Sequence, residues 1–313
     1  MANEATGTLW GLPNYTGELF TADMINTPFL SMIGGLTGGK MTTNFEFPTS
    51  SEYDHEALAQ ENITENESIA GVTPVNYTRD QSKNVTQIFQ AEVISSYVKQ
   101  SNQGRLAGIN TVGASNNIPS ELDWQIAKAL EGIARRVEWH FLQGTYSIAT
   151  TADTSNQTRG MIEACSVNTV AAANAALSKA LMDELLLEMF TNGAMFKNMV
   201  IFCGGFQKQA LSNLYGYAPE DRNVGGVNIK QIETDFGNIG IAAAHRLQPA
   251  GTLGLYDMSV ISPVFQPVPG KGNLFYESLA KTGAAESGQI FGPIGLNHGP
   301  LCAHGTLTGL AVQ

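Results

Sequence analysis

The chain has 313 residues, of which 43% are hydrophobic and only 14% are charged, and its formal net charge is −11. This length can bury a substantial core, arranged as one elaborated domain or as two. Because no segment carries a dense cluster of Lys or Arg, the composition excludes the basic surface on which sequence-specific nucleic-acid binding depends.

The cysteine spacing and the N-terminal composition bear on where the protein folds. Cys165, Cys203 and Cys302 are widely separated and form no paired motif, so we expect no disulfide framework and a reducing cytoplasm as the site of folding. Residues 1–8 lack the basic start and the apolar stretch of a signal peptide. No apolar run approaches the roughly 20 residues that span a bilayer, and we expect no membrane contact.

Residues 1–40 combine an irregular backbone with large apolar side chains. Repeated glycine and proline leave room for only a short helix around residues 18–26. Apolar side chains on such an arm need a surface to cover, either a neighbouring subunit or the domain to which the arm belongs. We favour the neighbour, and predict Trp10, Phe20 and Phe29 as inter-subunit contacts.

Residues 41–98 predict two strands separated by a long acidic excursion. Alternating apolar positions indicate strands at 43–47 and 85–97. The connection from residue 48 to 81 is long enough to be functional, and we interpret it as a projecting hairpin; a flexible acidic loop is the alternative. One base, Arg79, stands against its acids, which are Glu52, Asp54, Glu56, Glu61, Glu65, Glu67 and Asp80.

Residues 119–143 give the clearest pattern in the chain. Ser120 is a suitable N-cap, and Asp123 favours the positive end of the helix dipole. A helix of this length is roughly 36 Å long at ~1.5 Å per residue, and Arg135 and Arg136 fall in its second half. Its apolar stripe, spaced by three and four residues, consists of Leu122, Ile126, Leu130, Ile133, Val137 and Phe141.

The remainder of the chain predicts short alternating elements after a polar linker. The whole is α+β, with one long helix and no repeating βαβ pattern. We expect helices at 174–190 and from 204 to about 215, and strands at 199–203, 227–234, 239–244, 251–256, 273–279, 289–296 and 305–310.

No motif in the sequence indicates catalysis, a cofactor or a metal. The pair Gly204-Gly205 fits neither nucleotide-binding glycine pattern and predicts a tight turn. His298, Cys302 and His304 are close together, but lack a fourth zinc ligand and a defined spacing. No GxSxG elbow is present, although a Cys- or Ser-dependent hydrolase stays open as an alternative because such groups meet only in space.

Five stretches of the sequence carry a resemblance to a known family, and they are residues 27–29 (TPF), 83–89 (KNVTQIF), 121–138 (ELDWQIAKALEGIARRVE), 158–161 (TRGM) and 235–246 (DFGNIGIAAAHR). They look like the SU-ten phage major capsid family, and the order of the predicted parts resembles the HK97 phage capsid fold. The resemblance implies an N-terminal arm (1–40), strands with an extended loop (41–84), a peripheral domain (85–149 and 263–313) with a spine helix (119–143), and an axial domain (150–262).

The resemblance further implies a structural protein that forms hexamers and pentamers of an icosahedral virion shell around double-stranded DNA. It implies separate scaffolding and portal proteins, and decoration proteins as further candidates. In the prototype of the fold a loop lysine forms a covalent cross-link; residues 48–81 contain no lysine, so we expect non-covalent contacts. A negatively charged inner wall also suits a container for DNA, because it would not bind the polymer through counterion release.

Opposite charges suggest how two subunits could meet. We predict that the acidic excursion, with Glu61, Glu65 and Glu67, lies near Arg135 and Arg136 of an adjacent subunit. A tail-tube or other β-rich virion protein is the second hypothesis, ranked lower because such proteins generally lack a long amphipathic helix, and the hydrolase is the third.

Overall fold

The computed structural model describes most of the chain, with gaps. The predicted contact residues Trp10, Phe20 and Glu61 lie outside the described part. So does the helix expected around residues 18–26, except for its last residue. The described residues are 26–53, 62–71, 74, 76–101, 120–215, 222–224, 227–245, 247, 251–281 and 283–312.

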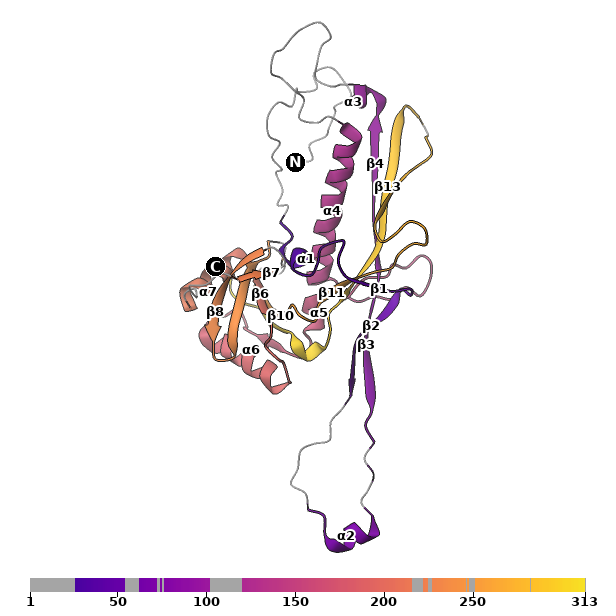
Figure 1. Cartoon of the computed structure of the whole chain (residues 1–313). Helices are drawn as coiled ribbons and strands as arrows, with labels where there is room; N and C mark the ends of the chain where they lie inside the picture. The colour runs from indigo at the N-terminus through magenta and orange to yellow at the C-terminus, as the bar shows by residue number, and fades with distance from the viewer. Residues whose placement is uncertain are drawn as a thin grey trace.

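One half of the body is a five-stranded sheet with a long helix along one face (Figure 1). The central strand is β13 (Ala285–Asn297), and β4 (Gln87–Ser96) pairs with it antiparallel over ten residues. The other strands are β1 (Lys40–Met41), β11 (Ser262–Phe265) and β12 (Phe275–Ser278), and the short helix α3 (Tyr97–Ser101) follows β4.

The long helix α4 (Glu121–Gln143) confirms the predicted element. The Ser120 side chain accepts a hydrogen bond from the Asp123 N–H, and Gly144 follows the last turn. The C-terminal half of the predicted stripe is fully buried at Ile133, Val137 and Phe141. The helix therefore packs most tightly in its second half, where the two halves of the body meet.

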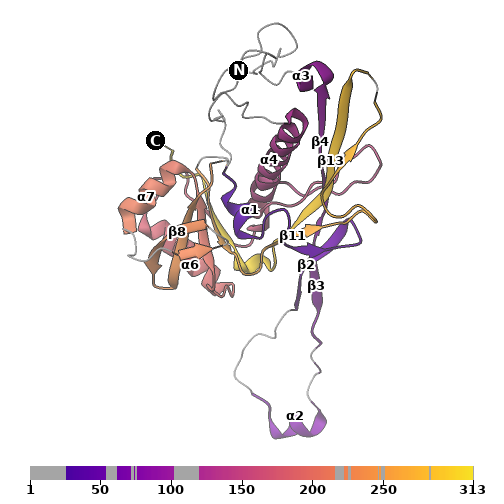
Figure 2. The ribbon, with the colours of Figure 1, turned by 45° about the horizontal axis from the view of Figure 1, so that its top comes forward.

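The other half of the body is a seven-stranded mixed sheet. Helices α6 (Lys179–Thr191) and α7 (Gly205–Tyr215) cover its outer face, as Figure 2 shows from a second direction. Its strands, in spatial order, are β5 (Thr169–Ala171), β14 (Gly305–Thr308), β10 (Leu253–Asp257), β6 (Met199–Cys203), β9 (Gly237–Ala243), β8 (Val227–Thr234) and β7 (Arg222–Val224).

The chain crosses between the two sheets more than once. Helix α5 (Met161–Ala164) and the 3₁₀ turn η1 (Leu301–Ala303) lie at these crossings. Because β14 pairs with β5 and β10, residues 305–308 belong to the seven-stranded sheet, whereas the sequence grouped them with the other one. Which of two sheets a short strand joins is decided by pairing with residues far away in the chain, so the local sequence does not indicate it.

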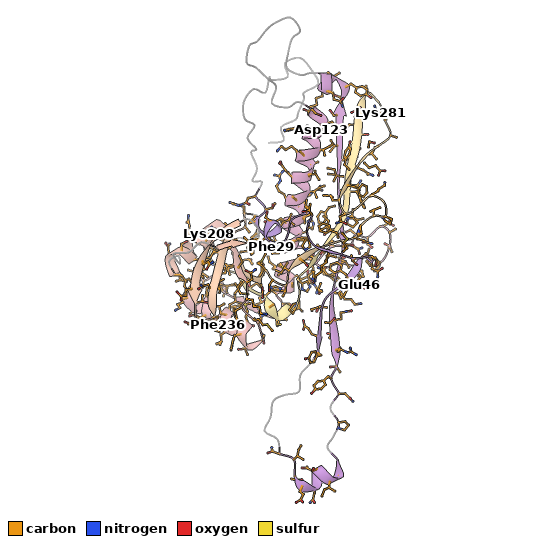
Figure 3. All side chains as sticks on the ribbon, in the orientation of Figure 1. Phe29, Glu46, Asp123, Lys208, Phe236 and Lys281 are labelled. Atoms are coloured by element: carbon orange, nitrogen blue, oxygen red, sulfur yellow. The ribbon has the colours of Figure 1, made fainter. Side chains whose placement is uncertain are left out.

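The prediction that Phe29 contacts a neighbouring subunit is wrong. Helix α1 (Pro28–Met32) places Phe29 between α4 and the seven-stranded sheet (Figure 3). There the Phe29 ring is 0% exposed, with its centroid 5.3 Å from that of Phe202 and 6.1 Å from that of Tyr256. Residues 28–33 of the predicted arm are thus part of the subunit's own core.

A buried carboxylate fixes α1 in this position. Glu138 on α4 is 2% exposed, and its two oxygens accept hydrogen bonds from the N–H groups of Phe29 (3.4 Å) and Leu30 (2.9 Å). These N–H groups have no partner within a helix of this length, so the carboxylate satisfies them. The polar anchor and the aromatic packing together join the chain's early segment to both sheets.

Replacing Phe29 with alanine should therefore destabilise the isolated subunit. We expect a loss of about 3–5 kcal/mol in the free energy of unfolding, because the substitution leaves a cavity in a fully buried site. Denaturant titration of the unassembled protein measures this loss. Phe206→Ala on α7, where the ring is 48% exposed, is the control, with an expected loss below about 1 kcal/mol; equal losses for the two variants would contradict the placement of Phe29.

Candidate functional site

A two-stranded hairpin leaves the body and extends into solvent (Figure 1). Strands β2 (Glu46–Tyr53) and β3 (Arg79–Val85) pair antiparallel, with Glu46 opposite Val85 at the root and Tyr53 opposite Arg79 at the far end. Of the described residues between 50 and 83, none is buried. Beyond the root, the described part of the hairpin has no apolar core of its own.

The far end of the hairpin carries a short acidic helix that the sequence prediction missed. Helix α2 (Glu65–Ala70) begins with a capping box, in which Glu67 accepts hydrogen bonds from the Thr64 N–H (2.9 Å) and hydroxyl (2.8 Å). These hydrogen bonds lower the pKa of Glu67. Thr64 followed by Glu67 is the usual sequence signature of such a start. Ile69 on the same helix is 79% exposed.

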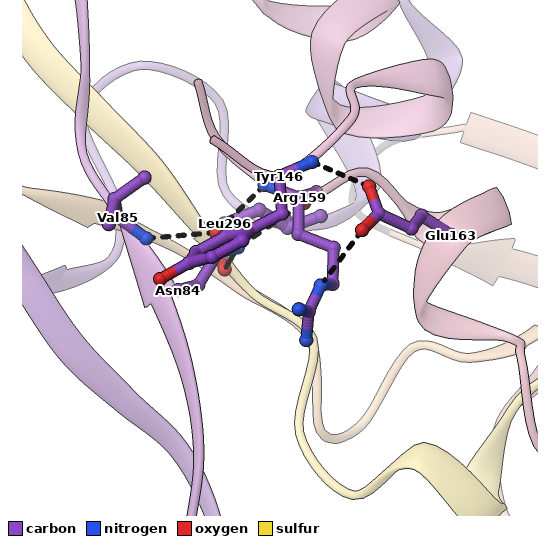
Figure 4. Close-up of polar contacts among 6 residues, drawn as sticks. All are labelled: Asn84, Val85, Tyr146, Arg159, Glu163 and Leu296. Carbon is purple, nitrogen blue, oxygen red and sulfur yellow. Dashed lines mark hydrogen bonds and ion pairs between the residues drawn. The ribbon is translucent and has the colours of Figure 1, made fainter. Parts of the chain in front are cut away.

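At the hairpin root, one buried side chain joins three segments (Figure 4). The Asn84 amide oxygen accepts hydrogen bonds from the N–H groups of Val85 (2.9 Å) and Arg159 (2.7 Å), and its nitrogen donates to the carbonyls of Leu296 (2.7 Å) and Arg159 (3.2 Å). Asn84 is 0% exposed. The Arg159 guanidinium in turn lies over the Tyr146 ring, 4.8 Å from its centroid.

Neighbouring side chains extend this connection. The Thr158 N–H donates to the Gln87 amide oxygen (3.3 Å), and the Thr158 hydroxyl accepts from the Leu296 N–H (3.1 Å). The stretches 83–89 and 158–161, which the sequence offered as separate marks of resemblance, are therefore in direct contact. The hydrogen bonds between the polar residues of these two stretches attach the hairpin to the body.

Close backbone approach completes the root. At Gly295 on β13, a Cβ atom would lie 2.8 Å from the Phe47 ring and 2.9 Å from the Val85 carbonyl oxygen. Only glycine leaves room for the hairpin to cross β13 here. Phe47, in the strand predicted at 43–47, is buried against this crossing, whereas Phe45, which precedes β2, is 47% exposed.

The predicted arginines line a groove that is formed by α4 together with Ala91 of β4. The groove has a volume of about 440 Å³, with small residues as its floor and Trp139, 40% exposed, beside them. The Arg136 guanidinium donates to the Gln90 carbonyl on β4 (3.1 Å). The lining contains no acidic side chain and consists of Ala91, Ala129, Gly132, Arg135, Arg136, Trp139 and His140.

The structure does not bring Glu65 or Glu67 to the arginines of the same chain. The acidic helix α2 lies at the far end of the hairpin, and α4, which carries most of the groove residues, lies on the opposite side of the root (Figure 1). A contact between them therefore requires a second copy. The sequence pointed to the two arginines, but not to the glycine and alanines that leave space beside them, because small residues carry no distinctive signal.

The two histidines near Cys302 in sequence, His298 and His304, are buried and make structural contacts. The His304 Nε2 faces the His298 carbonyl, and the His304 Nδ1 accepts from the Asp257 N–H (3.2 Å). Burial lowers the pKa of both histidines to about 4, with a smaller opposing effect of Asp257 on His304 and of the Gly299 carbonyl on His298. Neither ring is arranged to take up a proton in a reaction at neutral pH.

The thiols are equally unsuited to nucleophilic chemistry. Burial raises the pKa of Cys165 far above its ordinary value and that of Cys203 to about 12, so both stay protonated. Within the part of the chain that the structure describes, no cluster of three or more His, Cys, Asp or Glu side chains could hold a metal ion. Across the same residues, none of the helices combines the length and apolarity needed to cross a bilayer.

Comparison with known proteins decides the family. The sequence profile of the SU10 major capsid protein matches residues 2–311. The chain belongs to the SU10 major capsid protein family. It is therefore the major capsid protein of a phage, a structural component of the virion and not an enzyme. This family is the SU-ten family that the sequence resembled, and it replaces the tail-tube and hydrolase alternatives.

Solved structures show that this SU10 family member has the HK97-like capsid fold. The chain is similar to the capsid protein of cyanophage A-1(L), with a TM-score of 0.64 at 12% identity, covering 95% of this chain and 96% of that one. It is similar to the SrpI encapsulin of Synechococcus elongatus PCC 7942, with a TM-score of 0.61 at 12% identity and coverages of 96% and 94%. The capsid protein of phage XM1 gives 0.55 at 13% identity, with coverages of 94% and 95%.

A search of curated protein sequences finds no significant match. The family assignment of the SU10 family member thus comes from the profile, and the α+β architecture from the structural likeness. Self-assembly into a shell follows from the family.

The buried histidines predict a loss of stability in acid. They bind protons near pH 6.5 in the unfolded chain but only near pH 4 in the folded one. The unfolded state therefore takes up more protons between these values, and the free energy of unfolding falls as the pH is lowered from 6.5 to 4. The loss is up to about 3 kcal/mol for each histidine.

Denaturant titrations of the unassembled subunit across this pH range test the effect. His298→Asn removes one titrating group while keeping a donor for the Gly299 carbonyl, which His298 contacts through Nδ1. Its stability should depend less steeply on pH than that of the unmodified chain. Identical pH profiles for the two proteins would rule out the histidine as a cause.

Proposed function

We propose that this major capsid protein forms hexamers and pentamers of an icosahedral shell around double-stranded DNA. The observation that supports this most strongly is the hairpin, which projects from the body with no buried residue among those described beyond its root. An isolated two-stranded hairpin is at best marginally stable, and a neighbouring subunit would supply the missing surface. Negative-stain microscopy of the purified protein tests the proposal; closed shells support it, whereas only tubes or monomers oppose it.

The parts of the fold receive the following proposed roles. Residues 1–40 would include the arm, 41–84 the extended loop, and 150–262 the axial domain. The five-stranded sheet with α4 would form the peripheral domain, from 85–149 and the chain after 263, except that β14 pairs within the other sheet. Chain order and the two-sheet architecture support this division.

The hairpin tip and the α4 groove carry opposite charges, which supports a contact between them in two copies of the chain. Helix α2 presents an exposed Ile69 beside the carboxylate of Glu65, and Glu61 lies close by in sequence. The groove of a second copy offers a small-residue floor with Arg135 and Arg136 at its side. We assign Ile69 to the floor and the acids to the arginines. Charge would then set the register of the contact more than its affinity.

Glu67 has a structural role in addition to the inter-subunit contact that the sequence suggested. Its carboxylate already closes the capping box with Thr64, so it acts first as a helix-start residue that keeps Glu65 and Ile69 on one short helix. A contact with an arginine would use the lone pairs that remain on the same oxygens.

The composition of the loop bears on how the subunits are held together, and the family resemblance suggests further protein partners. Residues 48–81 contain no lysine, so the shell would be held by non-covalent contacts, with separate scaffolding and portal proteins and decoration proteins as candidates. Folding and assembly would take place in the host cytoplasm. With a net charge of −11, the wall would enclose DNA without binding a specific sequence.

Reversing both groove charges should stop assembly. Arg135→Glu with Arg136→Glu places two negative charges opposite the acidic tip, and also removes the hydrogen bond from Arg136 to Gln90, a cost of about 1 kcal/mol. We expect a folded subunit and a strongly reduced yield of shells, measured by sedimentation and microscopy. Normal shells from the double variant would refute the pairing.

A charge swap provides the matched control. Adding Glu65→Lys to the double variant restores attraction at one position and leaves the capping residue Glu67 in place. Partial recovery of shells is expected. Lys179→Glu with Lys208→Glu, on the helices of the other sheet, changes the net charge equally and should assemble normally; failure there as well would assign the effect to net charge.

The arm is tested by a truncation that spares the core. Removing residues 1–25, which include Trp10 and Phe20, leaves Phe29 and Leu30 in place. We expect unchanged unfolding of the isolated subunit and shells that dissociate at a lower temperature. Calorimetry of particles and subunits separates the two effects, and equally heat-stable particles would count against an inter-subunit role for the arm.

A further inference from the structure

The hairpin is joined to the five-stranded sheet over a very short stretch of chain. Strand β3 ends at Val85 and β4 begins at Gln87, so a single residue, Thr86, separates the hairpin from the five-stranded sheet. The direction of the hairpin relative to the body is therefore decided over these few residues.

Polar side chains at and next to Thr86 connect this point to segments far away in sequence. Thr86 donates through its hydroxyl to the Gln266 amide oxygen (2.9 Å), and Gln87 accepts from the Thr158 N–H (3.3 Å). Asn84 makes four hydrogen bonds, which involve both the N–H and the carbonyl of Arg159 as well as the end of β13 at Leu296.

We infer that Asn84 is a positioning residue, which sets the direction of the hairpin in the unassembled subunit by fixing β3 to Arg159 and Leu296. The amide supplies a double donor and a double acceptor, and all of its hydrogen-bonding sites are used. Aspartate would place an oxygen against two carbonyls, and alanine would leave buried main-chain groups without partners.

The inference deepens the proposed function, on which its significance for assembly depends. A hairpin held in one direction reaches a neighbour without a further loss of conformational freedom, which favours association. If the direction is not fixed, the same contact has to form from a wider range of orientations. The positioning itself can be measured before any contact with a neighbour.

The test measures one distance in the unassembled full-length subunit. Nitroxide labels are placed by Arg79→Cys at the end of β3 and by Ala180→Cys on α6, with the partly exposed Cys302 replaced by serine; Cys165 and Cys203 are buried. Double electron–electron resonance spectroscopy then gives the distribution of distances between the label at position 79 on the hairpin and the label at position 180 on the body. We expect a narrow distribution, which Asn84→Ala broadens or shifts.

Asn168→Ala is the matched control. Asn168 is also 0% exposed, donates to the carbonyls of Cys302 (2.9 Å) and His304 (2.7 Å), and accepts from Asn192 (2.7 Å), but it lies at the seven-stranded sheet. Both variants should lower the Tm of the subunit by similar amounts. Only Asn84→Ala should alter the distance.

The outcomes separate the inference from the proposed function. An unchanged distance in Asn84→Ala, or the same broadening in Asn168→Ala, would overturn the positioning role. A broadened distance together with normal shell yield would support the positioning role and contradict the proposed contact between hairpin and neighbour. Broadening with a specific loss of shells, absent in Asn168→Ala, supports both.

Discussion

The fold depends on a hairpin that cannot be stabilised by its own side chains. Beyond Thr49 on β2 and Asn84 on β3 none of the described residues of the two strands is buried, and the acidic helix at the far end is exposed as well. The hairpin is therefore held at one end only, by backbone pairing and by polar contacts at the root. Its remaining apolar residues, including Ile69, need a surface that the subunit does not provide.

The two sheets of the body are joined by buried contacts around the second half of α4. Helix α4 packs against both sheets, and Glu138 draws α1 and its Phe29 into the junction between them. Burying a carboxylate is costly unless its oxygens are satisfied, and here the first N–H groups of α1 satisfy them. Residues of both sheets thus share one buried core, and an interface that spans the two sheets would contact a single packed surface.

Sequence patterns predicted the elements whose stability is local. The long helix showed its cap at Ser120 and its stripe at Ile133, Val137 and Phe141, and the strand at 199–203 was apolar throughout. The serial order of the elements also led to the correct family. The capping box of α2 was present in the sequence, but its position within an acidic excursion concealed it.

The remaining features depend on contacts between distant residues. Phe29 stands in an irregular, glycine-rich context that suggested an arm, and only the pocket beside Phe202 and Tyr256 reveals its place in the core. Asn84 looked like any other asparagine until Arg159 and Leu296 were brought to it. The α4 groove likewise exists because Gly132 and Ala91, far apart in the chain, are both small.

The central claim is that the hairpin finds its stability on a second copy of the chain. A cryo-electron microscopy map of the assembled particle tests it most directly. We expect ordered density for α2 in the α4 groove of an adjacent subunit, with Arg135 and Arg136 beside it. A map in which each hairpin folds back on the subunit that carries it, or ends in solvent with the groove uncovered, would contradict the claim.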